Sequence, residues 1–420
     1  MLLARLRPWI IVTTLCLIYA LAVVAHQGSP LALVTIGEKF KGDLPLPAYS
    51  FEGYDGQFTY YIARDPSTAN RYLDVAAYRF QRILLPALGM VLSVGQVDWL
   101  PWALLLINLM ALAVGTWLLE ILLVRYNASR WYALGYGLSL GALGAARLSL
   151  PEPLAYALVL GAIVLGSRMQ TPPPDPLPSR FAYGEGAKNR AGRLLKWILG
   201  EKWIVPTAVL FALGGLAKET ALVIAAGYGL YLLIPSRMLS PLALRERGSG
   251  GEGFRWRDAI LFAIISLTPF IVWQWILYQH LGTFGGSSGG ALATGFEIIP
   301  FGGVLRILTE GNLGVFLVFA AILIPFAILP TLWGLRRCWN DFRKRDLSLY
   351  TGLLFAAAAI MLFLPFSTYR EILGILRFIV GLQIAVIVYA AYRHDRRVLR
   401  YSVLWALTVL FVVVSDFQKI

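Results

Sequence analysis

Residues 100–123 read LPWALLLINLMALAVGTWLLEILL, an apolar run with one acidic residue and no Lys or Arg. A helix needs roughly 20 such residues to cross the hydrocarbon core of a bilayer. Similar runs recur along the 420 residues, of which 58% are hydrophobic and 14% charged, whereas a soluble chain has about 45–50% apolar and about 25% charged residues. The sequence therefore predicts an all-α integral membrane protein that forms a single polytopic membrane domain over residues 1–420.

The apolar runs predict about eleven transmembrane helices. We place them at about 9–25, 100–123, 131–147, 153–167, 203–217, 220–234, 258–278, 312–332, 347–365, 372–392 and 399–414. The segment 83–95 (ILLPALGMVLSVG) is too short to cross and is expected at the interface or as a re-entrant segment. If it does cross with a tilt, every later loop changes sides.

The positive charges predict the orientation of these spans. With the N-terminus inside, 25 of the 37 Lys and Arg residues fall in inner loops, including the basic loops 168–202 and 235–257. Cytoplasmic loops carry such an excess, so we expect a multi-pass plasma-membrane protein with a cytoplasmic N-terminus. The same distribution accounts for the net charge of +14 without nucleic acid as a partner. The predicted transmembrane helices imply membrane lipids as partners.

Cysteine and histidine give no sign of a metal centre. Cys16 lies in the first apolar run and Cys338 in a basic loop, and the three histidines are scattered singly. No spacing typical of a disulfide framework or a zinc site is present.

The most polar stretch of the first outer loop (26–82) reads GYDGQFTYYIARDP, residues 53–66. Asp55 is placed as the N-cap of a short helix, which should end near Asp65 because the residue before a proline disfavours the α region. About ten helical residues separate the two aspartates by roughly 15 Å, so they do not form a carboxylate pair. Spacing alone leaves open whether Asp55 is a cap or a functional group.

The stretch 53–66 and the following LDVAAYRFQRILLPAL (73–88) resemble the first outer loop of bacterial GT-C membrane proteins. The nearest resemblance is to cell-surface glycopolymer formation proteins, and a more distant one is to mannosyltransferases that use dolichyl-phosphate sugars. It implies a GT-C-like bundle with a long outer catalytic loop that bears short helices. In such enzymes an aspartate of the first outer loop is the catalytic base or binds a metal, and Asp55 matches it.

The resemblance therefore implies a glycosyltransferase of the cell envelope, with its active site on the outer face. Its donor would be a polyprenyl-phosphate-linked sugar, and its acceptor a cell-surface glycan or a lipid. A divalent metal ion is an optional cofactor, with Asp55 as its ligand if one binds. Such a reaction needs a carboxylate near the acceptor hydroxyl and cations at the leaving phosphate, for which the arginine fork is well suited.

Several charged residues at outer span ends are candidates for binding the substrate. They are Arg79 and Arg82 in YRFQR, Glu152 in RLSLPEPL, Lys218 and Glu219 in LAKET, and Tyr369, Arg370 and Arg377 in FSTYREILGILRF. Isolated charges between apolar runs are usually functional. Arg370 and Arg377 are seven residues apart, which predicts one helix face.

Each candidate also has a structural interpretation. The arginines could pair with outer carboxylates or lipid headgroups, Lys218 with Glu219 across a tight turn, and Glu152 could cap its helix. Secondary site residues are Tyr54, Gln57, Tyr61 and Asp65. The tyrosines are candidates for sugar stacking or for the interfacial aromatic belt, and Asp65 for a structural cap with Arg64 as its partner.

Two other functions compete with glycosyl transfer. One is a transporter or flippase for lipid-linked sugars, and the other is a non-catalytic partner in glycopolymer assembly. Many transporters contain internal repeats, and we find none in this sequence. The outer-loop signature is local and one-sided, which favours an active site.

Overall fold

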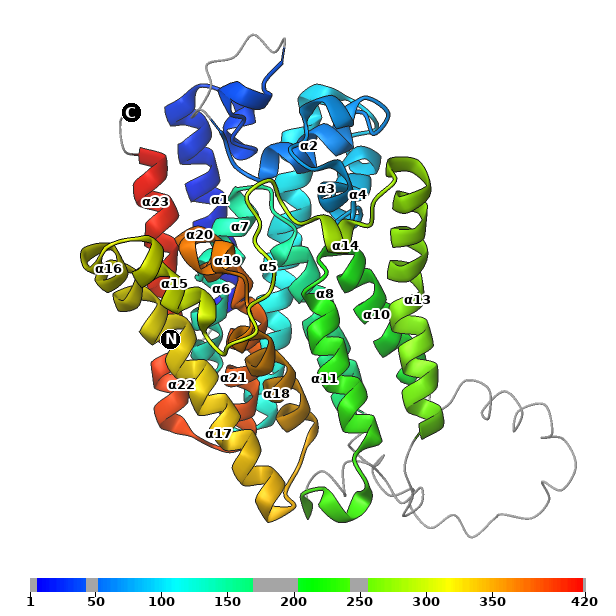
Figure 1. Cartoon of the computed structure of the whole chain (residues 1–420), viewed down its shortest axis with the longest axis vertical. Helices are drawn as coiled ribbons and strands as arrows, with labels where there is room; N and C mark the ends of the chain where they lie inside the picture. Colours follow the sequence, from blue (N-terminus) through cyan, green and yellow to red (C-terminus); the bar gives the residue numbers. More distant parts are fainter. Residues whose placement is uncertain (1–5, 43–51, 169–202, 242–255, 418–420) are drawn as a thin grey trace, which may run out of the picture.

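The computed structural model describes residues 6–42, 52–168, 203–241 and 256–417. Within these ranges the regular structure is helical, apart from two isolated β-bridges that join Ile36 to Gly53 and Leu239 to Leu347. The helices pack side by side into a bundle (Figure 1). Most of the two basic loops expected at 168–202 and 235–257 lies outside the described residues. The predicted all-α class is confirmed.

Five helical segments of the described residues are long and apolar enough to cross a membrane. They are α1 (Pro8–Gln27), α5 (Leu100–Arg125), α13 (Trp256–Leu281), α16 and α17 (Leu313–Leu323 and Leu329–Lys344, joined by η9, Ile324–Ile328), and α22 and α23 (Arg396–Ser402 and Leu410–Phe417, joined by η10, Val403–Val409). A sixth results if α20 (Ile372–Phe378) and α21 (Val380–Tyr392), which are bent by 42°, form one span. The chain is an integral membrane protein.

Eleven full-length spans are more than the described residues provide. Four of the expected spans are apolar helices shorter than 18 residues, namely α8 (Glu152–Arg168), α10 (Ile204–Ala217), α11 (Ala221–Leu233) and α18 (Leu349–Leu362). The span expected at 131–147 is broken into η6 (Arg130–Ala133), α6 (Leu134–Gly137), η7 (Leu140–Gly144) and α7 (Ala145–Arg147). The break falls at Ser139, where the backbone is extended, with a ψ of 158°. Hydropathy identified this apolar segment but not the interruption of its helix.

The remaining elements are short and lie mainly in the loops. The first long loop contains η2 (Pro30–Leu33), η3 (Glu38–Phe40), α2 (Gly56–Arg64), η4 (Ala69–Tyr72), α3 (Ala76–Phe80), α4 (Leu84–Leu92) and η5 (Val97–Trp99). Later loops contain η8 (Ser236–Met238), α14 (Gly285–Ser288), α15 (Gly302–Glu310) and α19 (Phe366–Arg370). At nine residues α4 is too short to cross, as we expected of 83–95.

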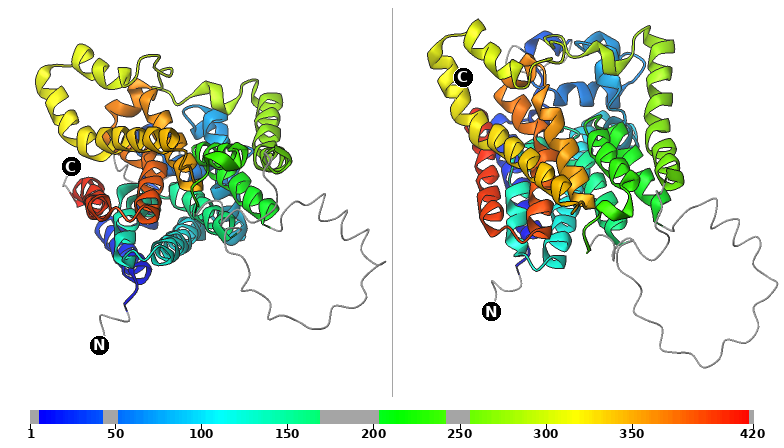
Figure 2. Two further views of the ribbon diagram at one scale, coloured as in Figure 1. Left: turned by 90° about the horizontal axis from the view of Figure 1, so that it is seen from below. Right: turned by 60° about the horizontal axis from the view of Figure 1, so that its bottom comes forward.

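Helix α21 is at the centre of the core. All thirteen of its residues are buried, and it packs against α5, α8 and α18. Helices α13 and α16 instead lie on opposite outer sides of the bundle (Figures 1 and 2). Only 17% of the most apolar window of α13 is buried, against 56% for the span that contains α5. The exposed apolar side chains of the outer helices are therefore placed to contact lipid.

The polar loops gather at two opposite ends of the bundle. Figure 1 shows α2 and α3 at the top, and the C-terminal end of α17 at the bottom. At the upper end Arg82 binds Glu219 and Arg377 binds Asp55, whereas at the lower end Arg125 binds Ser167 and Arg393 binds Asp346. These contacts join loops that the positive-inside pattern assigns to the same side.

Two glycines fix the start of α2. Gly53 has a φ of 68°, a conformation that favours glycine, and the amide of the next residue, Tyr54, donates to the Thr35 carbonyl. A Cβ on Gly56 would collide with the backbone carbonyl oxygen of Leu148. The side chain of Gln57 joins the two chain segments by accepting from Gly37 N and donating to Glu52 O. These contacts hold the N-terminal end of α2, and therefore Asp55, against the bundle.

Gly56→Ala should therefore destabilise the protein, because the new methyl group can be placed only by moving α2 or the backbone at Leu148. Overpacking of this kind costs on the order of 1–3 kcal/mol. Thermal unfolding in detergent measures the effect. Gly286→Ala is the matched control, because nothing lies within 4 Å of a Cβ at Gly286. Equal melting temperatures for the two variants would contradict this packing.

Candidate functional site

The carboxylate of Asp55 binds two arginines. One oxygen lies 2.9 Å from Nη1 of Arg79 and the other accepts a hydrogen bond of 2.8 Å from Nη2 of Arg377. Asp55 is the N-cap residue of α2, but its side chain makes no capping hydrogen bond. The predicted helix bounds are therefore confirmed, while the carboxylate is directed at the arginines instead of the helix end.

Arg79 is held in place by a second aspartate, Asp74. Its Nε and Nη2 each donate to an oxygen of Asp74 at 2.7 Å, which is the bidentate geometry of the strongest guanidinium–carboxylate pairs. The guanidinium carbon also lies 4.2 Å from the centre of the Phe58 ring. Sequence reasoning missed Asp74, although it lies inside the stretch 73–88 that carries the family resemblance.

Arg377 extends the network to a buried glutamate. Its Nε lies 3.6 Å from Oε1 of Glu152, and the same oxygen accepts from Nζ of Lys218. The other oxygen of Glu152 is buried and has no hydrogen-bond partner among the described residues. Arg377 also covers the ring of Tyr54 at 4.9 Å. Glu152 is thus a link between two cations and retains an unused acceptor.

Lys218 and Glu219 have different partners, so the alternative in which they pair with each other is wrong. Glu219 receives two hydrogen bonds from Arg82, of 2.9 Å from Nε and 2.6 Å from Nη2. Nη2 of Arg82 also donates to the hydroxyl of Tyr78 at 2.7 Å. The tight turn between α10 and α11 therefore directs one charge to Glu152 and the other to the first loop.

Several of these side chains line a pocket at the upper end of the bundle. It is lined by Asp55, Phe58, Thr59, Ile62, Arg79, Arg82, Pro86, Leu150, Pro151, Glu152 and Arg377. Three chain segments far apart in sequence supply these residues: the first loop with α2 and α3, the start of α8, and α20. The structure thus brings together Asp55, three of the predicted arginines and Glu152.

Other candidate residues lie outside this pocket. Arg370 is exposed and covers Phe366, and the chain between it and Arg377 is interrupted at Glu371, so these arginines do not share one helix face. Tyr369 is buried and donates to the Met361 carbonyl.

The secondary candidates have structural contacts. Gln57 joins two loop segments, as described above. Tyr61 is 2% exposed, donates to the Phe40 carbonyl and stacks on Tyr72, so its ring is unavailable to a sugar. Asp65 accepts from Ser67 and Thr68, rather than from the expected Arg64, at the end of α2.

The charges of the site balance one another. Burial by itself raises the pKa of Asp55, but the positive charges of Arg79 and Arg377 outweigh it and hold that pKa well below its usual range. Burial likewise opposes ionisation of Glu219, yet Arg82 lowers its pKa to about 2. With Asp74 and Glu152, the site holds four carboxylates opposite Arg79, Arg82, Lys218 and Arg377.

The site does not have the donor set of a metal centre. Within the described ranges, no three His, Cys, Asp or Glu residues lie close enough together to hold a metal ion. Both oxygens of Asp55 are bound by guanidinium groups, so each already has a positive partner. The residues present fit an anionic ligand better than a divalent metal.

Comparisons with known proteins find a distant structural likeness. No family model and no curated protein matches the chain. Two solved structures are similar over 96% of the chain, both of ArnT from Cupriavidus metallidurans. The structure bound to undecaprenyl phosphate is 14% identical with a TM-score of 0.38 over 76% of ArnT, and the apo structure is 15% identical with a TM-score of 0.36 over 75%. Similarity at this level does not transfer a function, which must be inferred from the pocket itself.

Proposed function

We propose that the protein is a GT-C-type membrane glycosyltransferase. It transfers a sugar from a polyprenyl-phosphate-linked donor to a glycan or lipid acceptor on the outer face of the membrane. The observation that supports this most is the pairing of Asp55 with Arg79 and Arg377 in one pocket. A carboxylate suited to take a proton and cations suited to hold a phosphate are within contact of each other.

In the proposed reaction the acceptor hydroxyl oxygen attacks the anomeric carbon of the donor sugar. The bond between that carbon and the phosphate oxygen breaks, and the electron pair leaves with the polyprenyl phosphate. Asp55 takes the proton of the hydroxyl. Arg79, Arg82 and Arg377 stabilise the negative charge that develops on the leaving phosphate, because guanidinium groups match phosphate oxygens in geometry and charge.

The ion pairs of Asp55 determine when it can act. A carboxylate bound by two arginines is a weak base, because both cations stabilise its charged form. A donor phosphate competes for the same arginines. When the phosphate replaces Asp55 as the partner of Arg377 and of Nη1 of Arg79, the basicity of Asp55 rises and its oxygens become available to the acceptor. The donor therefore binds before the acceptor in the proposed mechanism.

Glu152 and Asp74 are positioning residues in this mechanism. Asp74 fixes the guanidinium of Arg79 through two hydrogen bonds. Glu152 lies between Arg377 and Lys218, and its free oxygen can accept a further hydrogen bond when Arg377 moves. Both carboxylates also hold cations in the pocket before the donor arrives.

Asp55→Asn should abolish transfer while the protein remains folded, because the amide cannot take the proton. Loss of a general base lowers a rate typically by 10²–10⁴-fold. Turnover of a labelled donor by purified protein measures this. Asp65→Asn is the control, since Asp65 contacts only neighbouring hydroxyl and amide groups at the end of α2. A transporter or an assembly partner would show no turnover in the wild type. Near-normal turnover in Asp55→Asn would exclude Asp55 as the base.

Arg377→Ala should weaken donor binding by about ten- to hundredfold, because a charge-assisted hydrogen bond contributes about 1.5–3 kcal/mol. Arg370→Ala is the matched control: it removes the same side chain from an exposed position outside the pocket. Binding of a polyprenyl phosphate in nanodiscs is the measurement. Equal losses in the two variants would assign the effect to surface charge instead of the pocket.

The pH dependence should differ between free and donor-bound protein. Because the pKa of Asp55 is depressed below that of a free aspartate, the carboxylate stays ionised as the pH falls to about 4. The value of kcat/KM for the donor reports the free protein. Protonation of Asp55 should therefore not lower kcat/KM between pH 7 and about 5. The acid limb of the kcat profile should appear at a higher pH than that of kcat/KM. In the donor-bound protein the arginines bind the phosphate and no longer depress the pKa of Asp55. An acid limb at the same pH in both profiles would contradict the release of Asp55.

A further inference from the structure

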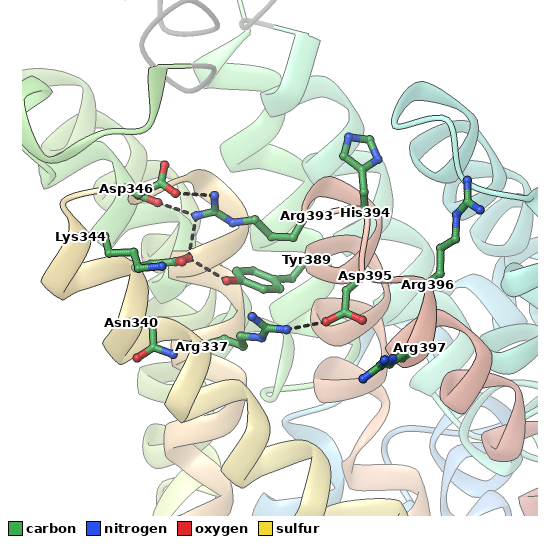
Figure 3. A pocket seen from close by; sticks show the side chains of 11 residues that line it. Arg337, Asn340, Lys344, Asp346, Tyr389, Arg393, His394, Asp395, Arg396 and Arg397 are labelled. Carbon is green, nitrogen blue, oxygen red and sulfur yellow. Dashed lines mark hydrogen bonds and ion pairs between the residues drawn. The ribbon is translucent and has the colours of Figure 1, made fainter.

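A second polar cavity lies at the opposite end of the bundle from Asp55. It has a volume of about 530 Å³ and is lined by α17 on one side and by the end of α21, the following turn and the start of α22 on the other (Figure 3). Ligand pockets have volumes of about 300–1,000 Å³. The cavity belongs to neither the Asp55 pocket nor the proposed reaction.

The lining of the cavity is predominantly cationic. Arg337 and Lys344 lie on α17, and Arg393, Arg396 and Arg397 lie on the other side, opposite three aspartates. The cavity therefore carries two more positive than negative charges. Figure 3 shows that the ion pairs use only part of this set.

The three aspartates are already bound by two of the arginines. Arg393 lies 2.9 Å from Asp341 and 2.6 Å from Asp346, and Arg337 lies 2.6 Å from Asp395. These carboxylates are therefore not available as a set to hold a metal cation.

The remaining cations are available to an anion. Lys344, Arg396 and Arg397 have no carboxylate partner among the described residues and are exposed. Nε of Arg393 is buried without a hydrogen-bond acceptor in the same part of the chain. The cavity thus offers donors from both of its sides while its carboxylates are neutralised.

The position of the cavity favours an anion that contains phosphate. The apolar part of α17 ends at Leu335, directly before the basic run that begins with Arg336, so this end of the helix is placed where lipid headgroups lie. Basic pockets between transmembrane helices bind anionic headgroups, and arginine and lysine are the side chains that bind phosphate oxygens. We propose that this cavity is a binding site for a phosphate group, carried by an anionic phospholipid or by a free phosphate compound.

The test uses the full-length protein and distinguishes the two sources. In one arm, native mass spectrometry counts the phosphatidylglycerol retained by protein extracted from mixed phosphatidylcholine–phosphatidylglycerol membranes, and titration with that lipid gives its affinity. In the other arm, protein in phosphatidylcholine nanodiscs is titrated with inorganic phosphate and pyrophosphate by calorimetry. Binding in the first arm identifies a lipid headgroup, and binding in the second a soluble phosphate compound.

The variant Lys344→Gln/Arg397→Gln removes one cation from each side of the cavity. It should lower the affinity in whichever arm shows binding by about tenfold or more, because each lost contact is charge-assisted. The matched control, Arg336→Gln/Arg343→Gln, removes two exposed charges of α17 that do not line the cavity and should leave the affinity unchanged. If the double variant does not fold, Lys344→Gln alone is compared with Arg343→Gln.

Two results would overturn the proposal. One is the absence of binding in both arms. The other is an equal loss in the cavity variant and the control, which would indicate attraction to the whole basic surface. Neither readout involves sugar transfer, so this site and the proposed function can fail independently.

Discussion

The ion pair between Asp55 and Arg377 is the contact on which the upper end of the molecule depends. It joins the first loop to α20 across 322 residues of sequence, next to an apolar core in which an unpaired charge would be costly. Arg377 also lies beside Glu152, and Glu152 beside Lys218, so the same chain of charges connects α20 to the start of α8 and to the turn before α11. The first loop, whose apolar side chains also pack against α5 and α13, is thereby joined to the bundle through its charges as well.

This arrangement also gives the pocket its chemical character. Its charges neutralise one another, because each of its arginines lies beside at least one carboxylate. An incoming phosphate can bind by exchanging with those carboxylates, and that exchange increases the basicity of Asp55 at the moment when a base is needed. The contacts that balance the charges of the pocket would then also be the ones through which the donor activates Asp55. The opposite end of the bundle differs, because its cavity contains cations in excess.

The sequence predicted the all-α membrane class and the helix after Asp55, because hydropathy and the proline at 66 are local signals. It could not predict where the helix within an apolar run is interrupted, because the break at Ser139 depends on packing. The first outer loop and the span ends contained most of the site's charges, namely Asp55, Arg79, Arg82, Glu152, Lys218, Glu219 and Arg377. Their pairing was not predictable: Lys218 and Glu219 are adjacent yet have different partners, and Asp74 has no distinctive pattern of its own.

The central claim is that a donor phosphate takes the arginines that pair with Asp55. A structure of the protein with a bound polyprenyl phosphate tests this most directly. The account predicts phosphate oxygens within about 3 Å of the guanidinium groups of Arg377 and Arg79, with the carboxylate of Asp55 released and facing the pocket. A phosphate bound elsewhere, with both ion pairs of Asp55 unchanged, would contradict it.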